Sequence, residues 1–168
     1  IPTIVQENGG VRQYAFNLLK VCSENYSENY TFYIYHKRND SLFLDLVKNT
    51  PNFELIQTHF FAKFKIKSAV YLNKIFYKLS FKKSKLPLNF LDFLIKKHNI
   101  DIIHCPYQFI PKTKRAKLIC TLHDVQQLHF PEFFTSNELE SRAKNYPDFI
   151  NRSDAIIVSF NHVKEDLI

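Results

Sequence analysis

The chain has 168 residues, of which 45% are apolar and 23% are charged, so its composition is ordinary for a globular protein and does not favour a disordered one. It contains only 2 Gly, which excludes collagen-like and Gly-rich segments and any phosphate loop that needs three or four glycines. The formal net charge is +7. The sequence has no run of about 18 apolar residues and opens on no signal peptide, so we expect a cytoplasmic protein without a transmembrane helix.

Two further expectations come from the cysteine content and from the two ends of the chain. The three cysteines, Cys22, Cys105 and Cys120, are too scattered for a disulfide framework and suit a reducing compartment. There is no Met, and the last residues, Asn161–Ile168, have the pattern of a helix start. We therefore expect the chain to be a fragment of a longer protein.

The predicted elements alternate between strand and helix from the first residue onwards. A first strand at Ile1–Val5 is separated by Gly9–Gly10 from a helix at Val11–Ser23, whose apolar residues recur at helical spacing. Apolar and β-branched runs predict the further strands Thr31–His36, Phe53–Gln57, Asp101–His104, Lys117–Leu122 and Asp154–Ser159. Helices are predicted at Leu42–Lys48, Ala62–Phe81, Leu88–His98, Asn137–Asn151 and Asn161–Ile168, with Pro147 expected to kink or end the fourth of these.

Short apolar strands that alternate with helices are typical of a parallel sheet with helices on both faces. The sequence shows no regular internal repeat and no low-complexity linker. We therefore predict one α/β domain with a doubly wound, mostly parallel, Rossmann-like sheet.

The positive charge is concentrated between Leu55 and Leu91, where no acidic residue occurs. In the predicted helix Ala62–Phe81 and just beyond it, four lysines fall on nearly one line: Lys67, Lys74, Lys78 and Lys85. Two interpretations stay open, a solvated face of a helix packed on the core and a basic face that lies on an anionic membrane surface. Nucleic acid is not an expected partner, because Lys dominates over Arg and no RNP, zinc-finger or helix-turn-helix pattern is present.

Polar residues or tight turns stand where several predicted strands end. The sites are Gly9–Gly10, His104, His123–Asp124 and Ser159. If the strands are parallel, these ends share one edge of the sheet, which is where open α/β sheets bind ligands. This convergence predicts a single binding crevice.

Each candidate residue also has a structural interpretation. The glycine pair either admits an anion such as a diphosphate to the backbone N–H groups of a helix start or forms a tight turn. His123 either bonds sugar hydroxyls and moves protons or is a rim histidine whose neighbour Asp124 caps the next turn. Ser159 is predicted to be the N-cap of the last helix.

Metal and thiol chemistry are not expected. Cys120, His123 and His129 have a spacing that zinc can use, but Cys120 lies within a predicted strand and no second ligand pair accompanies it. Cys105 adjoins His104 on a strand, so the two side chains point to opposite faces and form no dyad.

Three segments of the chain, taken in order, resemble the amino-terminal domain of family 4 glycosyltransferases, which have the GT-B fold. The first is Gly9–Tyr14 (GGVRQY) with Asn17–Leu19, the second is Asp101–His104 (DIIH) with Lys117–Asp124 (KLICTLHD) and Pro131, and the third is Arg142 with Ser153–Ser159 (SDAIIVS) and Lys164–Leu167 (KEDL). The segment Asp40–Lys97 matches nothing in that pattern beyond its helix periodicity.

The resemblance implies a retaining transferase that moves a sugar from a nucleotide-diphosphate sugar to a carbohydrate or lipid-linked acceptor hydroxyl. It places Gly9 and Gly10 at the donor diphosphate, His123 at the donor sugar near the reacting carbon, and Asp124 and His104 on the acceptor side. No metal or other cofactor is implied. A second domain with a Glu-x7-Glu element would hold the nucleotide, so the chain alone is expected to be inactive. Polysaccharide or glycolipid synthesis at the inner membrane face is the expected setting.

Two alternatives stay open at this point. One is a sugar-nucleotide epimerase or phosphorylase with the same two-domain architecture. The other is a basic peripheral module that associates with a membrane or polyanion and has no catalytic activity.

Overall fold

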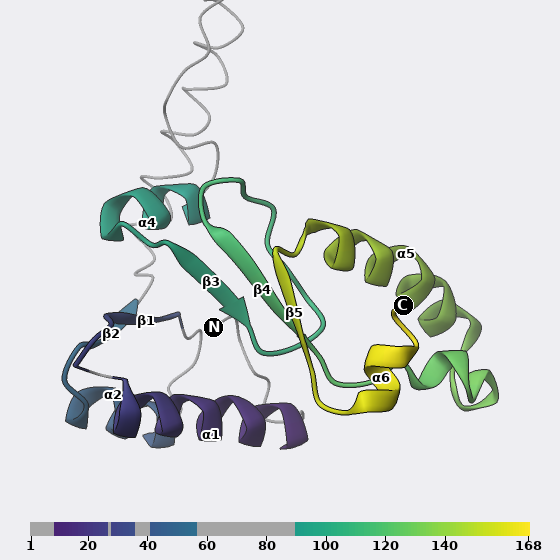
Figure 1. Ribbon diagram of the computed structural model, residues 1–168, viewed down its shortest axis with the longest axis horizontal. Coiled ribbons are helices and arrows are strands. Elements are labelled where there is room, and N and C mark those ends of the chain that lie inside the picture. The colour runs from purple at the N-terminus through teal and green to yellow at the C-terminus, as the bar shows by residue number, and fades with distance from the viewer. Residues whose placement is uncertain (1–8, 27, 36–40, 57–89) are drawn as a thin grey trace, which may run out of the picture.

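The computed structural model describes residues 9–26, 28–35, 41–56 and 90–168, which form a mixed α/β structure with two small parallel sheets (Figure 1). In the first sheet β1 (Phe32–Tyr35) pairs with β2 (Phe53–Ile56). In the second, β4 (Lys117–Leu122) lies between β3 (Ile102–Cys105) and β5 (Ala155–Val158). Every pairing is parallel, which confirms the α/β class and the parallel strands predicted from the sequence.

The helices of the described residues fall where the apolar periodicity predicts them. They are α1 (Gly9–Asn25), α2 (Ser41–Asn49), α4 (Phe90–His98), α5 (Ser136–Arg152) and α6 (Asn161–Glu165). Two short 3₁₀ turns, Gln126–Leu128 and Pro131–Phe133, follow β4. The predicted strand Ile1–Val5 and the predicted basic helix Ala62–Phe81, with Lys67, Lys74, Lys78 and Lys85, lie outside the described residues.

One core joins α1 and α2 to the first sheet. Ala15 and Leu19 are four residues apart on α1, hence on one face, and both are buried. They pack with Ile34 of β1 and with Phe43 of α2. This packing places α1 against β1 and sets the direction in which its first turn points.

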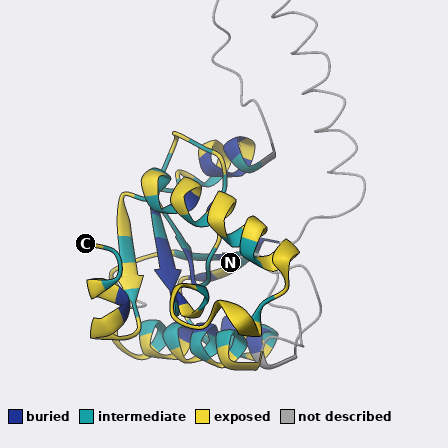
Figure 2. Cartoon of the chain, turned by 90° about the vertical axis from the view of Figure 1, so that its right-hand side faces the viewer, coloured by how far each residue is buried: buried dark blue, intermediate teal, exposed yellow. Residues whose placement is uncertain are grey.

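The second core lies between β4 and the helices that follow it. Leu118, Cys120 and Leu122 alternate along β4 and are buried with Phe149 of α5 and Val163 of α6. Figure 2 shows these buried segments in dark blue behind helices whose outer sides are exposed. The residues between them, including Thr121, therefore point to the other face of the sheet, toward α1.

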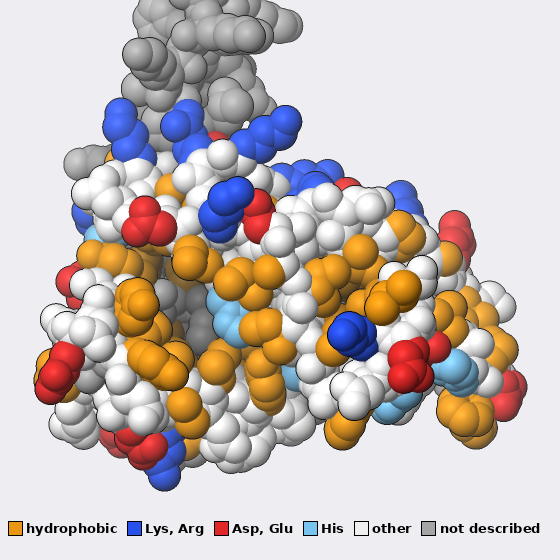
Figure 3. Space-filling view, in the orientation of Figure 1, with side chains coloured by type: hydrophobic (Ala, Val, Ile, Leu, Met, Phe, Trp, Pro, Cys, Tyr) orange, Lys and Arg blue, Asp and Glu red, His pale blue; other side chains and the backbone are white. Residues whose placement is uncertain are grey.

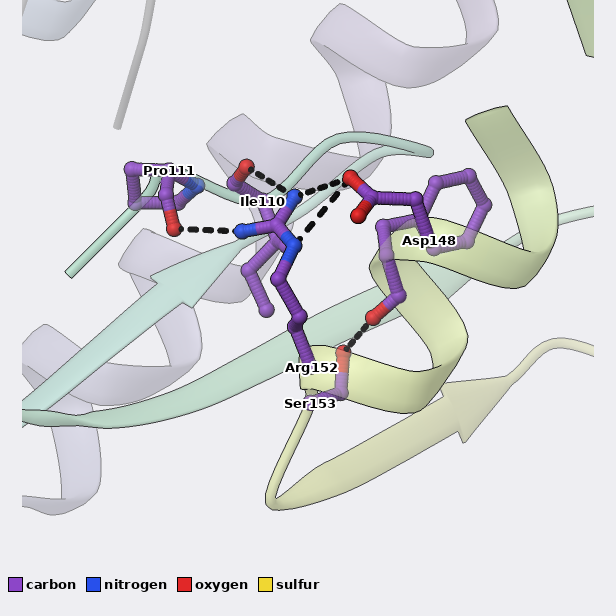
Figure 4. A network of polar contacts seen from close by, with 6 residues as sticks. Ile110, Pro111, Asp148, Arg152 and Ser153 are labelled. Atoms are coloured by element: carbon purple, nitrogen blue, oxygen red, sulfur yellow. Dashed lines mark hydrogen bonds and ion pairs between the residues drawn. The ribbon is translucent and has the colours of Figure 1, made fainter. Parts of the chain in front are cut away.

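The two ends of α5 are held by side chains. Thr135 and Glu138 form a capping box at the start, in which Thr135 N donates to Glu138 Oε2 at 2.8 Å. At the other end, Arg152 donates to the carbonyl oxygens of Ile110 and Pro111 at 3.2 and 2.9 Å, while Asp148 accepts from it at 2.7 Å (Figure 4). These bonds tie the connection between β3 and β4 to α5. Pro147 lies within α5 and does not end it.

The register of β5 against β4 is fixed at Asp154, just before β5. Its carboxylate accepts from Lys117 Nζ at 2.7 Å and from the backbone N–H of Leu118 at 2.8 Å. These bonds, that from Lys117 first, hold the pKa of Asp154 below its ordinary 3.8. Register errors at this end of β5 would break both bonds at once.

Among the helices of the described residues, none has the combination of length and apolarity that crossing a membrane requires.

Candidate functional site

His123 follows β4 directly and therefore lies just beyond the carboxyl edge of the three-stranded sheet. Its Nε2 is 2.9 Å from the carbonyl oxygen of Pro106, and its Nδ1 is 3.1 Å from Ser159 Oγ. A carbonyl oxygen only accepts, so in the neutral ring Nε2 carries the proton and Nδ1 accepts from the Ser159 hydroxyl. The ring is thereby held in one orientation by residues that follow β3 and β5.

The position of Ser159 corrects a prediction. Ser159 is not the N-cap of α6, because that place is taken by Phe160, whose side chain makes no capping hydrogen bond. The Ser159 hydroxyl is instead turned toward His123, and the residue is exposed. Ser159 is thus a partner of the histidine at the sheet edge.

Tyr14 of α1 stands over the end of β4. Its ring meets the ring of His123 edge-on, with centroids 4.8 Å apart and planes at 83°. The Tyr14 hydroxyl is 3.4 Å from Thr121 Oγ1. Because Gly10 lies one helical turn before Tyr14 on the same face of α1, the first turn of α1 is brought to the same edge of the sheet as His123.

The sequence predicts that His104 ends its strand, and the structure corrects this, because β3 continues to Cys105 and His104 is its next-to-last residue. Its Nε2 is 2.9 Å from Oγ1 of Thr121, whose side chain is fully buried. Burial lowers the pKa of His104, so the imidazole is neutral near pH 7. The strand ends at Cys105, where burial raises the thiol pKa to about 12, so this sulfur stays protonated.

The two glycines lie within the first turn of α1, which corrects their prediction as residues that precede the helix. Neither has a positive φ, and a Cβ added to either would meet no atom of the described residues within 4 Å. A tight turn therefore does not explain them. The first N–H groups of a helix have no partner within it.

Asp124 is held by α5. Its Oδ1 is 3.5 Å from Arg142 Nη1 and 3.4 Å from the backbone N–H of Gln126, the turn contact that the structural interpretation anticipated. The Arg142 guanidinium lies over the ring of Phe134 at 4.4 Å, so its direction is fixed. His104 and Asp124, both predicted on the acceptor side, therefore have different neighbours.

The three residues with zinc-like spacing also have separate partners. Cys120 Sγ donates to the Tyr107 carbonyl oxygen at 3.4 Å, and His129 Nε2 is 2.8 Å from Asp166 Oδ2. Within the part of the chain that the structure describes, no three His, Cys, Asp or Glu side chains are placed to hold a metal ion.

Sequence reasoning did not single out Tyr14, Thr121 or Arg142 as members of this site. Thr121 carries a local signal, because it lies near the end of β4, two residues before His123, which follows that strand directly. Tyr14 carries another, since it lies four residues after Gly10 in a helix. The contact of Arg142 with Asp124 has no signal in the sequence.

No family model, no curated protein and no solved structure matches this chain. The site is therefore interpreted from its own chemistry and from the motifs that it contains.

Proposed function

We propose that this chain is the amino-terminal, doubly wound domain of a retaining glycosyltransferase of the family 4 type. The enzyme transfers a sugar from a nucleotide-diphosphate donor to an acceptor hydroxyl, in polysaccharide or glycolipid synthesis on the cytoplasmic side of a membrane. One observation carries the proposal. Tyr14, His123 and Ser159 belong to three separate motif segments, and His123 contacts both of the others at the carboxyl edge of a parallel sheet. That edge is where open α/β sheets bind ligands.

The Ser159–His123 pair supplies groups suited to a sugar hydroxyl. While Ser159 donates to His123 Nδ1, its oxygen still has lone pairs that accept from a substrate hydroxyl. If Ser159 turns away, Nδ1 itself accepts that hydroxyl, while the bond from Nε2 to Pro106 keeps the ring in place. His123 therefore serves the donor sugar either directly or through Ser159.

The first turn of α1 supplies the complementary group for the donor. Gly9 and Gly10 place no Cβ beside its backbone N–H groups, which allows an anion to approach them, and a helix start favours negative charge. Catalysis then rests on stabilising the leaving diphosphate, with basic groups of the second domain completing the site. His104 and Asp124 line the acceptor side in this proposal.

The test is product analysis with the protein that carries both domains, using nucleotide sugars as donors and lipid-linked or oligosaccharide acceptors. A new glycosidic bond is the expected product, whereas an isomerised sugar or a sugar phosphate would assign the fold to an epimerase or a phosphorylase. We expect His123→Ala to lower turnover about 10- to 100-fold, the equivalent of one hydrogen bond of about 1.5–3 kcal/mol to a charged or reacting group.

His129→Ala is the matched control, because His129 is also bonded to a polar side chain but is paired with Asp166 and not with Ser159. Its turnover should stay near that of the unmodified protein. Near-ultraviolet circular dichroism checks that both variants fold. Equal turnover in the two variants would remove His123 from the site.

A second candidate, nucleophilic acyl transfer, is favoured by one feature of the same pair. Ser159 is exposed at a strand-to-helix turn, with its Oγ 3.1 Å from a histidine that a carbonyl orients. A fluorophosphonate probe distinguishes the two functions, since a covalent adduct on Ser159 would favour the hydrolase over the transferase.

A further inference from the structure

His123 makes two hydrogen bonds, and one of them is easily given up. The Ser159 hydroxyl, 3.1 Å from Nδ1, belongs to an exposed residue and is the group that a substrate hydroxyl would displace. The ring then keeps the 2.9 Å bond from Nε2 to the carbonyl oxygen of Pro106. A single bond of this kind adds little net stability, because water offers the same bond. A further contact is needed to keep Nδ1 directed at the substrate.

Tyr14 of α1 supplies such a contact. Its ring meets the ring of His123 edge-on, with centroids 4.8 Å apart and planes at 83°. An edge-on pair is favoured because the positive edge of one ring meets the negative face of the other, and a ring that turns away loses this contact. Figure 3 shows histidine side chains set between hydrophobic ones where the strands of the second sheet end. The Tyr14 ring therefore stabilises the orientation in which Nε2 of His123 meets Pro106.

Tyr14 is itself held at two points. Along the chain, its neighbour Ala15 is fully buried in the core that joins α1 to the first sheet, and Leu19 is buried one turn further on. At the end of its side chain, the Tyr14 hydroxyl is 3.4 Å from Oγ1 of Thr121, a fully buried residue of β4. The helix backbone and the phenol ring are thus tied to different sheets, and the position of the ring depends on the contact with Thr121.

The Thr121 hydroxyl continues this contact to β3, because its Oγ1 also lies 2.9 Å from Nε2 of His104. A hydroxyl has one proton to donate, so it can donate to only one of these two neighbours. A phenol O–H is more acidic than an aliphatic hydroxyl and is the better donor, whereas a neutral imidazole nitrogen is more basic than either oxygen and is the better acceptor. The favoured direction therefore runs from the Tyr14 hydroxyl to Thr121 Oγ1 and from there to His104 Nε2. Hydrogen bonds aligned in this way polarise and strengthen one another.

We propose that Tyr14 is a positioning residue, which holds His123 in the orientation that serves the donor sugar. Its anchor is the hydrogen-bond chain that runs from its hydroxyl through Thr121 to His104. The two histidines then have opposite tautomers: His123 carries its proton on Nε2, which faces a carbonyl oxygen, and His104 accepts at Nε2 and carries its proton on Nδ1. Burial lowers the pKa of His104, which keeps its ring in the neutral state that can accept.

The positioning role rests on the proposed function, because an oriented His123 is useful where it meets the donor sugar. The chain of bonds also couples the two sides of the proposed site, since His104 stands on the acceptor side and His123 on the donor side. Neither the tautomers nor the restraint of the ring requires sugar transfer in order to be measured. Failure of the inference and failure of the proposed function are therefore distinguishable.

NMR of the imidazole nitrogens in the isotope-labelled chain, at about pH 8 where imidazoles are neutral, reports which nitrogen carries the proton. In the unmodified chain we expect the proton of His123 on Nε2 and that of His104 on Nδ1. Tyr14→Leu should lower the preference of His123 for its held orientation about 2- to 10-fold, and its nitrogen signals should move toward the average of the two tautomers. Tyr14→Phe keeps the ring and should cause a smaller change. Tyr26→Leu is the matched control, because Tyr26 directly follows the other end of α1 and is 49% exposed.

Three results would overturn the inference. The first is a proton on Nε2 of His104 in the unmodified chain, a measurement that requires no variant to fold. The second is the same His123 signals in the Tyr14→Leu and Tyr26→Leu chains. The third comes from Thr121→Val, which removes the anchor and should shift the His123 signals in the unmodified chain, whereas Thr121→Ser should restore them. In the Tyr14→Leu chain the anchor has no ring to hold, so Thr121→Val should cause no further shift there; an equal shift in both chains would show that Thr121 acts through the backbone and not through Tyr14.

Discussion

Replacing Gly10 by alanine separates a structural glycine from a functional one. Gly10 lies in the first turn of α1 with φ outside the left-handed region, and an added Cβ meets no atom of the described part of the chain within 4 Å. Alanine has the higher helix propensity, so Gly10→Ala should stabilise the chain by about 0.5–1 kcal/mol. With a urea m-value of about 1–3 kcal/mol per M, the unfolding midpoint should rise by about 0.2–1 M.

The same substitution should impair sugar transfer. A methyl group on the open side of the first turn keeps a diphosphate away from the backbone N–H groups, and loss of one such donor lowers turnover by about 100-fold. We therefore expect Gly10→Ala in the proposed two-domain transferase to be more stable and at least about tenfold slower. Val21→Ala, which raises helix propensity at the other end of α1, is the control for stability alone. Higher stability with unchanged turnover would refute the role of the glycine in donor binding, and lower stability would refute the helical placement itself.

Three further predictions follow from single contacts. Thr121→Val leaves His104 Nε2 without its partner at 2.9 Å and should lower the free energy of unfolding, measured in urea, by about 1–3 kcal/mol. Thr121→Ser is the control, because it keeps the hydroxyl. Equal unfolding midpoints for the two variants would show that this bond contributes nothing. Asp154 has a folded-state pKa below 3.8 because of its bond from Lys117, so its stabilisation is present above that value and is lost as the pH falls through the folded pKa. Melting temperatures between pH 2 and 6 should therefore change less in Asp154→Asn than in the unmodified chain, and parallel curves would contradict the assignment. Iodoacetamide at pH 8 should modify Cys22, which is partly exposed, before the two buried cysteines, and mass spectrometry of the native chain would detect any other order.

Local pattern accounts for most of the described fold. In β4 the alternation of Leu118, Cys120 and Leu122 is sufficient to predict which face of the strand is buried, because side chains on a strand alternate strictly. The start of α5 is equally local, since Thr135 and Glu138 satisfy each other within one turn. Such features depend on neighbours in the sequence and are therefore predictable from it.

The parts of the site that the sequence did not predict depend on packing between distant elements. Ser159 precedes a helix, which favours an N-cap, but the tertiary position of His123 gives its hydroxyl a partner across the sheet edge instead. The family resemblance predicts an acceptor-side position for Asp124. Its contact with Arg142 could not be predicted, because it exists only where α5 packs beside the end of β4. Two adjacent glycines are typical of a turn, so the sequence predicted one here. In the structure neither glycine has a positive φ, and α1 begins at Gly9 and includes both.

The contacts at the sheet edge bear on the family resemblance in a way that the motifs alone do not. Each motif is a loose pattern, and an unrelated α/β chain can match one of them by chance. Such a chance match sets no condition on three-dimensional placement, yet Tyr14 and Thr121, which are 107 residues apart, are in contact, as are His123 and Ser159, which are 36 apart. The members of different motifs therefore form one site.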